Sequence, residues 1–206
     1  MVYNMDIFLI EGRIMRILEE RILKDGKVLS GNVLKVDSFL NHQLDVNLLN
    51  EIGKELYKLY QNCDITKVLT IEASGIGVGC MVAQFFNCPL VFAKKNKTSN
   101  IDEDVYCSQI ESFTHGCTYN VIVSKDFLNE NDNVLIVDDF LAKGNALKGL
   151  IDIVRQSGAN VAGCGIAIEK GYQGGGDELR RQGIRVESMA IVEKMDPTTG
   201  AVDFRK

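Results

Sequence analysis

Two adjacent acidic residues, Asp138 and Asp139, follow an apolar run at 134–137 and precede a turn that contains glycine. A helical pattern begins at residue 144, and the start of a helix offers backbone N–H groups and the positive end of its dipole. Those groups suit a phosphate monoester, whereas the carboxylates suit hydrogen-bond donors such as the vicinal hydroxyls of a ribose. The pattern therefore predicts a site for a ribose 5-phosphate, and plain capping of the helix is the competing interpretation.

The elements that would position these carboxylates alternate between strand and helix. Short apolar runs, typical of strands covered on both faces, lie at residues 67–71, 90–93, 134–137 and 161–168. Helical patterns lie at residues 16–24, 45–60, 77–86 and 144–157. Asp45 is the expected N-cap of the second helix, and Gly26 is the expected stop of the first. This alternation predicts an α/β fold with a parallel sheet, which binds ligands at its carboxyl edge.

Two segments depart from the alternation. Residues 105–113 and 119–124 have the pattern of two strands and predict a hairpin inserted after the second core strand. Residues 28–40 are expected to be extended or irregular. The polar, charged residues 94–104 have no period and predict a mobile loop.

Composition limits the class of protein. The chain has 206 residues, 46% of them apolar, and a net charge of −5, which predicts one domain and argues against a nucleic-acid partner. No apolar run reaches the roughly 18 residues of a membrane span. The six cysteines form no Cys-x-x-Cys pair and lie mostly in apolar runs, so we expect buried, reduced thiols. With only His42 and His115 as histidines, zinc chemistry has little support.

Several motifs resemble one family. Residues 138–146 are similar to the phosphoribosyl pyrophosphate (PRPP) motif of the type I phosphoribosyltransferases, in the form found in bacterial xanthine phosphoribosyltransferases. Residues 33–43 resemble the hood motif of that family, and residues 70–76 resemble its pyrophosphate loop. Residues 168–170 and 185–188 resemble its base-binding and C-terminal strands. The motifs occur in order and at sensible spacing, so the resemblance covers most of the chain.

The resemblance implies the type I phosphoribosyltransferase fold, a central, mainly parallel sheet flanked by helices and completed by a small hood. We expect a single phosphoribosyltransferase domain over residues 15–206, with the hood at about 15–45 and 185–206 and the core at about 46–184. Residues 1–14 are expected to be a non-native or mis-assigned N-terminal extension, because residues 10–13 read like an engineered protease site.

The resemblance also implies transfer of the 5-phosphoribosyl group from PRPP to xanthine, giving xanthosine 5′-monophosphate and pyrophosphate in purine salvage. It implies a cytoplasmic homodimer that uses Mg²⁺ bound with PRPP, without a nucleic-acid or membrane partner. The expected catalytic residues are Asp138 and Asp139. The expected ligand contacts are PRPP at Ala142, Lys143, Gly144, Asn145 and Ala146, pyrophosphate at Ala73, Ser74 and Gly75, and xanthine at Leu34, Asn41 and Lys170. No protein ligand is assigned to Mg²⁺, an ion that keeps much of its hydration shell.

The residue types fit these implied roles. Xanthine carries two oxo groups, and the ammonium of Lys170 and the amide of Asn41 are donors for them. Leu34 and Phe140 would supply apolar faces for the ring. Taken in isolation, Lys170 reads as an exposed lysine at a strand end, Asn41 as a turn residue and Leu34 as a core residue. The small residues of 73–75 leave room for pyrophosphate to approach the backbone N–H groups.

Ala142 departs from the wider superfamily. Many hypoxanthine-guanine enzymes have an acidic residue at this position, which contacts the purine ring. We expect xanthine, which is acidic enough to react as its anion, to need no such base. Asp138 and Asp139 would then orient the ribose and stabilise an oxocarbenium-like transition state. Residues 94–104, with three lysines, would either close over pyrophosphate or remain a solvated loop.

Two alternatives stay open from the sequence. Guanine or hypoxanthine could replace xanthine as the main base. A regulator with the same fold could sense PRPP and bind nucleic acid without turnover, although the negative charge and the short N-terminus argue against it.

Overall fold

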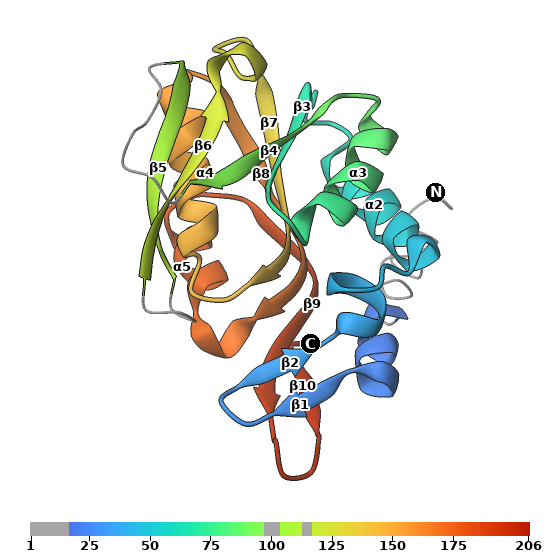
Figure 1. Ribbon diagram of the computed structural model, residues 1–206. Coiled ribbons are helices and arrows are strands. Elements are labelled where there is room, and N and C mark those ends of the chain that lie inside the picture. The colour runs from blue at the N-terminus through green and yellow to red at the C-terminus, as the bar shows by residue number, and fades with distance from the viewer. Residues whose placement is uncertain (1–16, 97–103, 113–116) are drawn as a thin grey trace, which may run out of the picture.

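The computed structural model describes residues 17–96, 104–112 and 117–206, and an eight-stranded sheet forms its centre (Figure 1). The strand order is β10-β9-β8-β7-β3-β4-β6-β5. The strands are β3 (Lys67–Ile71), β4 (Leu90–Asn96), β5 (Val105–Ser112), β6 (Cys117–Ser124), β7 (Asn133–Leu141), β8 (Asn160–Lys170), β9 (Val186–Met195) and β10 (Val202–Phe204). The pairings from β4 through β3, β7 and β8 to β9 are parallel, and the remaining three are antiparallel. The predicted mainly parallel sheet is confirmed.

Helices cover both faces of this sheet (Figure 1). One face packs against α2 (Val46–Tyr60) and α3 (Gly75–Phe86), and the other packs against α4 (Asn145–Gln156). Side chains of β7 alternate between the two resulting cores, because successive residues of a strand point to opposite faces. Leu135 and Val137 join the core under α2 and α3, while Val134 and Ile136 join the core under α4.

A smaller unit lies beside the carboxyl ends of the parallel strands. It contains a helical stretch at residues 17–25, the antiparallel hairpin of β1 (Lys27–Leu29) and β2 (Val33–Lys35), and a π-helix, η1 (Asp37–Asn41). The first helix ends where predicted, as the Gly26 N–H donates to the carbonyl of Ile22 at 2.9 Å. Figure 1 places β1 and β2 near β10. The division into hood and core stays a prediction, and residues 1–14 lie outside the described residues.

The structure corrects three expectations. Residues 94–96 belong to β4 rather than to a loop, because Lys94 and Lys95 pair with β6; residues 97–103 lie outside the described residues. The strand β7 runs through both acids and ends at Leu141. The cysteines whose side chains are described form no disulfide, as expected, but only Cys164 is buried. Cys80 is exposed, because it lies on the outer side of α3.

Two short helical elements lie between β8 and β9. A 3-10 turn, η3 (Gly171–Gln173), leads into α5 (Gly175–Arg181). A second 3-10 turn, η2 (Lys125–Phe127), follows β6. Within the described part of the chain, no helix is both long enough and apolar enough to span a membrane.

Candidate functional site

The two predicted catalytic acids lie inside β7. The side chains of Asp138 and Asp139 are only 5% and 6% exposed, and the Asp139 N–H donates to Asp138 Oδ1 at 3.0 Å. They do not end the strand as expected, because Phe140 and Leu141 continue the pairing with β8. Burial, followed by the neighbouring Asp139 carboxylate, raises the pKa of Asp138 well above its usual value. The structure therefore concentrates two carboxyl groups in a site of low polarity.

The predicted phosphate-binding turn connects β7 to α4. Gly144 has a φ of 84° and acts as the N-cap residue of α4, with no side chain capping the helix. Because Gly144 has no side chain to cap the helix, the N-terminal turn of α4 is suited to a bound anion. Ala142, Lys143 and Gly144 form this turn, and their binding of the 5′-phosphate stays a prediction.

The start of α5 packs closely against the same turn. A Cβ atom built on Gly175 would lie 2.3 Å from the carbonyl oxygen of Ala142 and 2.6 Å from the amide nitrogen of Gly144. Such distances leave no room for any side chain. Gly175 was not a predicted site residue, although the run of three glycines at 174–176 signals a close approach of backbone.

The predicted pyrophosphate loop reaches the same carboxylates. It lies between the end of β3 at Ile71 and the start of α3 at Gly75, and its Glu72–Ala73 peptide bond is cis. A Cβ atom on Gly75 would lie 2.2 Å from Thr70 Oγ1 and 2.8 Å from Asp138 Oδ1. Gly75 therefore allows the loop and Asp138 to be direct neighbours, and the binding of pyrophosphate by the loop stays a prediction.

A cleft of about 540 Å³ opens in front of the predicted phosphate-binding turn. Its walls come from the β7–α4 connection, the end of β8, the β1–β2 turn and the β5–β6 hairpin. The residues that line it are Gly31, Asn32, Val33, Ile110, Tyr119, Phe140, Leu141, Ala142, Lys143, Gly144, Asn145, Ala146, Leu147, Lys170 and Gln173. The whole predicted PRPP segment and the predicted base-binding lysine thus face one cavity.

Lys170 ends β8, one position after Glu169, which pairs with Leu141 at the end of β7. Its Nζ donates to the carbonyl of Asn32 at 3.2 Å and lies 5.6 Å from the centre of the Phe140 ring. Burial lowers the pKa of its ammonium. The Tyr172 hydroxyl donates to the same carbonyl at 3.3 Å. The sequence analysis did not predict that Asn32 and Tyr172 contact each other beside Lys170. The turn at Gly31-Asn32 was a local signal for Asn32 alone.

The other two predicted base contacts lie elsewhere. Leu34 is 5% exposed and packs in the core of the sheet, while its neighbour Val33 lines the cleft. Asn41 ends η1 and is exposed, outside the cleft wall. The structure does not bring these two residues together with Lys170, and their roles in xanthine binding stay predictions.

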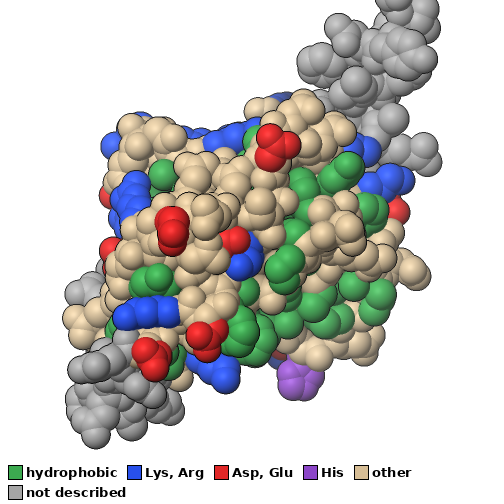
Figure 2. Space-filling view, turned by 90° about the horizontal axis from the view of Figure 1, so that it is seen from above, with side chains coloured by type: hydrophobic (Ala, Val, Ile, Leu, Met, Phe, Trp, Pro, Cys, Tyr) green, Lys and Arg blue, Asp and Glu red, His purple; other side chains and the backbone are tan. Residues whose placement is uncertain are grey.

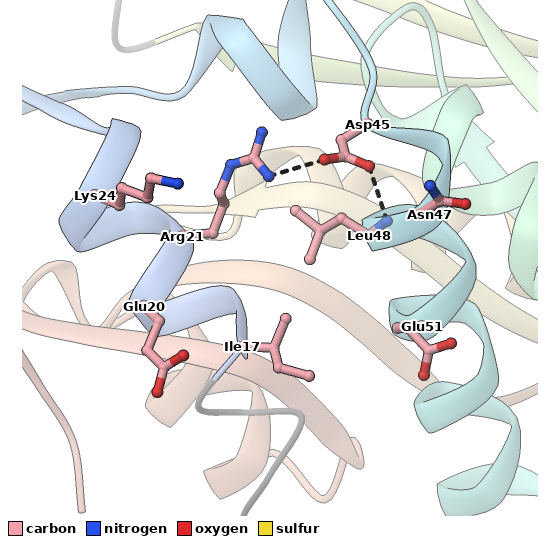
Figure 3. Close-up of a pocket in the computed structure, with 8 residues that line it drawn as sticks. All are labelled: Ile17, Glu20, Arg21, Lys24, Asp45, Asn47, Leu48 and Glu51. Atoms are coloured by element: carbon pink, nitrogen blue, oxygen red, sulfur yellow. Dashed lines mark hydrogen bonds and ion pairs between the residues drawn. The ribbon is translucent and has the colours of Figure 1, made fainter.

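A separate cavity of about 410 Å³ lies between the helix at 17–25 and the start of α2. Arg21 Nη1 donates to Asp45 Oδ2 at 2.8 Å across it, and Asp45 Oδ1 caps α2 by accepting from the Leu48 N–H (Figure 3). Its wall carries charges of both signs, which Figure 3 shows on Lys24 and Glu51. No residue is common to the linings of this cavity and of the cleft at the predicted phosphate-binding turn.

Metal binding by protein groups alone has no basis in the described ranges. Within them, no cluster of three or more His, Cys, Asp or Glu side chains is arranged to hold an ion. The Asp138 and Asp139 pair offers two carboxylates only. This donor set fits an ion such as Mg²⁺, which keeps most of its water and takes further oxygens from a phosphorylated ligand.

Comparison with known proteins identifies the family of the chain. The family model described as phosphoribosyl transferase domain matches residues 35–188, and the chain belongs to this family. Solved adenine phosphoribosyltransferases share the fold: that of Rhodothermus marinus has a TM-score of 0.68 at 22% identity over 87% of this chain and 98% of its own. That of Saccharomyces cerevisiae has a TM-score of 0.69 at 18% identity over 86% and 99%.

Within the family, the chain groups with the bacterial xanthine phosphoribosyltransferases. The enzyme of that name from Lachnoclostridium phytofermentans is 61% identical over 93% of this chain and 98% of its own. The Clostridium novyi and Bifidobacterium adolescentis proteins of the same name are 59% and 55% identical, each over 93% of this chain and 100% of their own. The resemblance inferred from motifs is confirmed.

Proposed function

We propose that the chain transfers the 5-phosphoribosyl group from PRPP to xanthine, giving xanthosine 5′-monophosphate and pyrophosphate in purine salvage. The observation that carries the proposal is one shared cleft. The start of α4, which has glycine as its N-cap residue, the turn at 142–144 and Lys170 all face this cleft. The identity of up to 61% with xanthine phosphoribosyltransferases supports the same substrate.

Each part of the site has a role in this reaction. The backbone N–H groups at 142–146 hold the 5′-phosphate, and the loop at 73–75 holds the pyrophosphate. Asp138 and Asp139 accept hydrogen bonds from the ribose hydroxyls and stabilise the positive charge that develops on the ring. The bond from C1 to the pyrophosphate oxygen breaks as a ring nitrogen of xanthine bonds to C1, and that base loses its proton to solvent.

We further propose that Mg²⁺ accompanies PRPP. When bound, the ion would neutralise charge on the pyrophosphate as it leaves. The loop at 73–75 would hold it through the pyrophosphate oxygens, since the described residues contain no cluster of three or more His, Cys, Asp or Glu side chains arranged to hold an ion. The cytoplasmic location stays a prediction.

Steady-state rates with xanthine, guanine, hypoxanthine and adenine, each with PRPP and Mg²⁺, test the function. We expect xanthine to give the highest kcat/KM. A higher value for guanine or hypoxanthine would reassign the base. Absence of pyrophosphate release with all four bases would contradict transfer and would favour a regulator that senses PRPP.

Replacement of Lys170 by Ala is expected to raise the KM for xanthine about tenfold or more, because a hydrogen bond from an ammonium to the oxo group is lost. The KM for PRPP should stay nearly unchanged, since the Lys170 ammonium is directed to the Asn32 carbonyl and the Phe140 ring rather than to the turn at 142–144. Lys24→Ala removes the same charge at the separate cavity and serves as the control. A parallel rise of both KM values in Lys170→Ala would contradict the base-binding role.

The acidic limb of the pH–rate profile is expected to lie above the ordinary aspartate pKa of about 3.9. Only the ionised form of Asp138 stabilises positive charge, and its pKa is raised by burial and by Asp139. Activity is therefore present above that raised pKa and is lost as the pH falls through it. Asp139→Asn removes the neighbouring charge and should move the limb of kcat to lower pH. A limb that does not move would contradict the assignment.

We also propose that the enzyme is a homodimer joined through the outer face of α3. This helix is apolar on nearly all sides, with Cys80 exposed and Phe85 partly exposed, and such helices are normally covered. Hydrophobic side chains gather on the right of Figure 2, the side on which Figure 1 draws α2 and α3. Light scattering should give about twice the chain mass of 22.9 kDa. Cys80→Glu should shift it towards the monomer, whereas Cys107→Glu on the distant β5 should not.

A further inference from the structure

Arg205, which follows β10 at the edge of the sheet, forms an ion pair with α5. Its guanidinium binds Asp177 with two hydrogen bonds, from Nη1 to Oδ1 at 2.8 Å and from Nη2 to Oδ2 at 3.0 Å. Its Nε donates to Glu193 on β9, and its own N–H donates to the Ile191 carbonyl at 2.8 Å. The hydrogen bond from Arg205 lowers the pKa of Asp177. Arg205 is thus fixed to β9 at one end and to α5 at the other.

A second arginine fixes α5 from the other side. Arg180 donates to both oxygens of Glu169, at 2.9 and 2.7 Å, and to Asp177 at 3.2 Å. Glu169 is 1% exposed and also accepts from the Ser188 hydroxyl at 2.5 Å. Asp177 therefore lies between two arginines, and we name Arg205, Asp177, Arg180 and Glu169 the α5 ion-pair network.

The network is more than a surface feature. Isolated exposed ion pairs contribute about 0–1 kcal/mol to stability, because solvent screens them. Here both pairs are bidentate, which adds geometric precision to the attraction. One end is anchored on a buried carboxylate of β8, next to Lys170. The arrangement therefore serves to place α5 more than to add stability.

The first residue of α5 lies against the turn that connects β7 to α4. The Cα of Gly175 packs against the backbone of the phosphate-binding turn, with a built Cβ 2.3 Å from Ala142 O and 2.5 Å from Lys143 C. Figure 1 shows α5 beside the start of α4. Because these contacts are between backbone atoms, a shift of α5 moves the turn directly. Small displacements of a binding group are costly in catalysis.

We propose that Arg205 is a positioning residue for PRPP, which acts through Asp177 and α5 to hold the turn at 142–144 in its binding geometry. The inference rests on the proposed function only for its kinetic readout. It assigns a role in substrate binding to a residue that does not line the cleft.

Steady-state kinetics of Arg205→Ala and Asp177→Asn test the proposal. Coupling through packed elements changes binding by about 0.5–2 kcal/mol, so we expect the KM for PRPP to rise about twofold to thirtyfold. The KM for xanthine should stay within about twofold, a split that general loosening of the fold would not produce. Arg205→Lys, which keeps the charge, should recover part of the loss. Arg181→Ala, on the exposed side of the same helix, is the matched control and should leave both KM values unchanged.

Amide hydrogen exchange gives a readout that does not depend on activity. Without substrate, Arg205→Ala should increase exchange at residues 143–146, while exchange in α3 stays as in the wild type. Unchanged exchange at the turn together with an unchanged KM for PRPP would overturn the proposal. A wild-type protein that releases no pyrophosphate with any purine would instead overturn the proposed function, and the exchange experiment would still decide the role of Arg205.

Discussion

Replacement of both Asp138 and Asp139 by Asn is expected to lower kcat at least about a hundredfold, the usual cost of removing preorganised charge from a developing transition state. Both carboxylates are buried, so the charge they offer is weakly screened by water. Asparagine keeps the shape and part of the hydrogen bonding. The experiment therefore isolates the charge from the packing.

The stability of this double variant separates chemistry from folding. The pKa of Asp138 is raised, which means that the protein holds the ionised form at a cost. Removing the charge should leave the melting temperature unchanged or higher at neutral pH. Asp152→Asn, on the exposed side of α4, is the matched control and should keep full activity. Activity within about tenfold of the wild type in the double variant would exclude an electrostatic role for the pair.

Local signals predicted the central elements well. The strand β3 occupies Lys67–Ile71, the range expected from its apolar run, because turn residues bound it on both sides. The helix α2 begins after Asp45, which caps it as its residue type and the apolar spacing indicate. The PRPP segment was also recognisable, since strand, acids, glycine and helix follow one another within a dozen residues.

Features that depend on distant partners were not predictable in the same way. The strand β4 extends to Asn96 only because β6 pairs with Lys94 and Lys95. The contact from Lys170 to Asn32 spans 138 positions in the chain, and no local pattern encodes it. The ion pairs around Asp177 join α5 to Arg205 and, through it, to β9. In the sequence these charged residues show no local pattern that would predict the pairing. Tertiary pairing, rather than propensity, determines each of these features.

Gly175→Ala is expected to raise the KM for PRPP about tenfold to a hundredfold. The added methyl would lie 2.3 Å from Ala142 O and 2.6 Å from Gly144 N, and both of these are backbone atoms that cannot rotate away. Either the turn or α5 must shift, and a misplacement of about 1 Å can cost about a hundredfold in rate. The measurement is the KM for PRPP with xanthine saturating, together with the melting temperature.

Gly174→Ala separates this steric effect from strain. Gly174 has a φ of 75°, so alanine is strained there by about 1–2 kcal/mol, but an added Cβ meets no atom within 4 Å. This control should lower stability and leave the KM for PRPP close to that of the wild type. Gly175→Ala should show the opposite balance, with a large change in KM. A KM for PRPP within twofold of the wild type in Gly175→Ala would mean that the turn binds phosphate without support from α5, and the role inferred for Arg205 would then lose its physical link to the site.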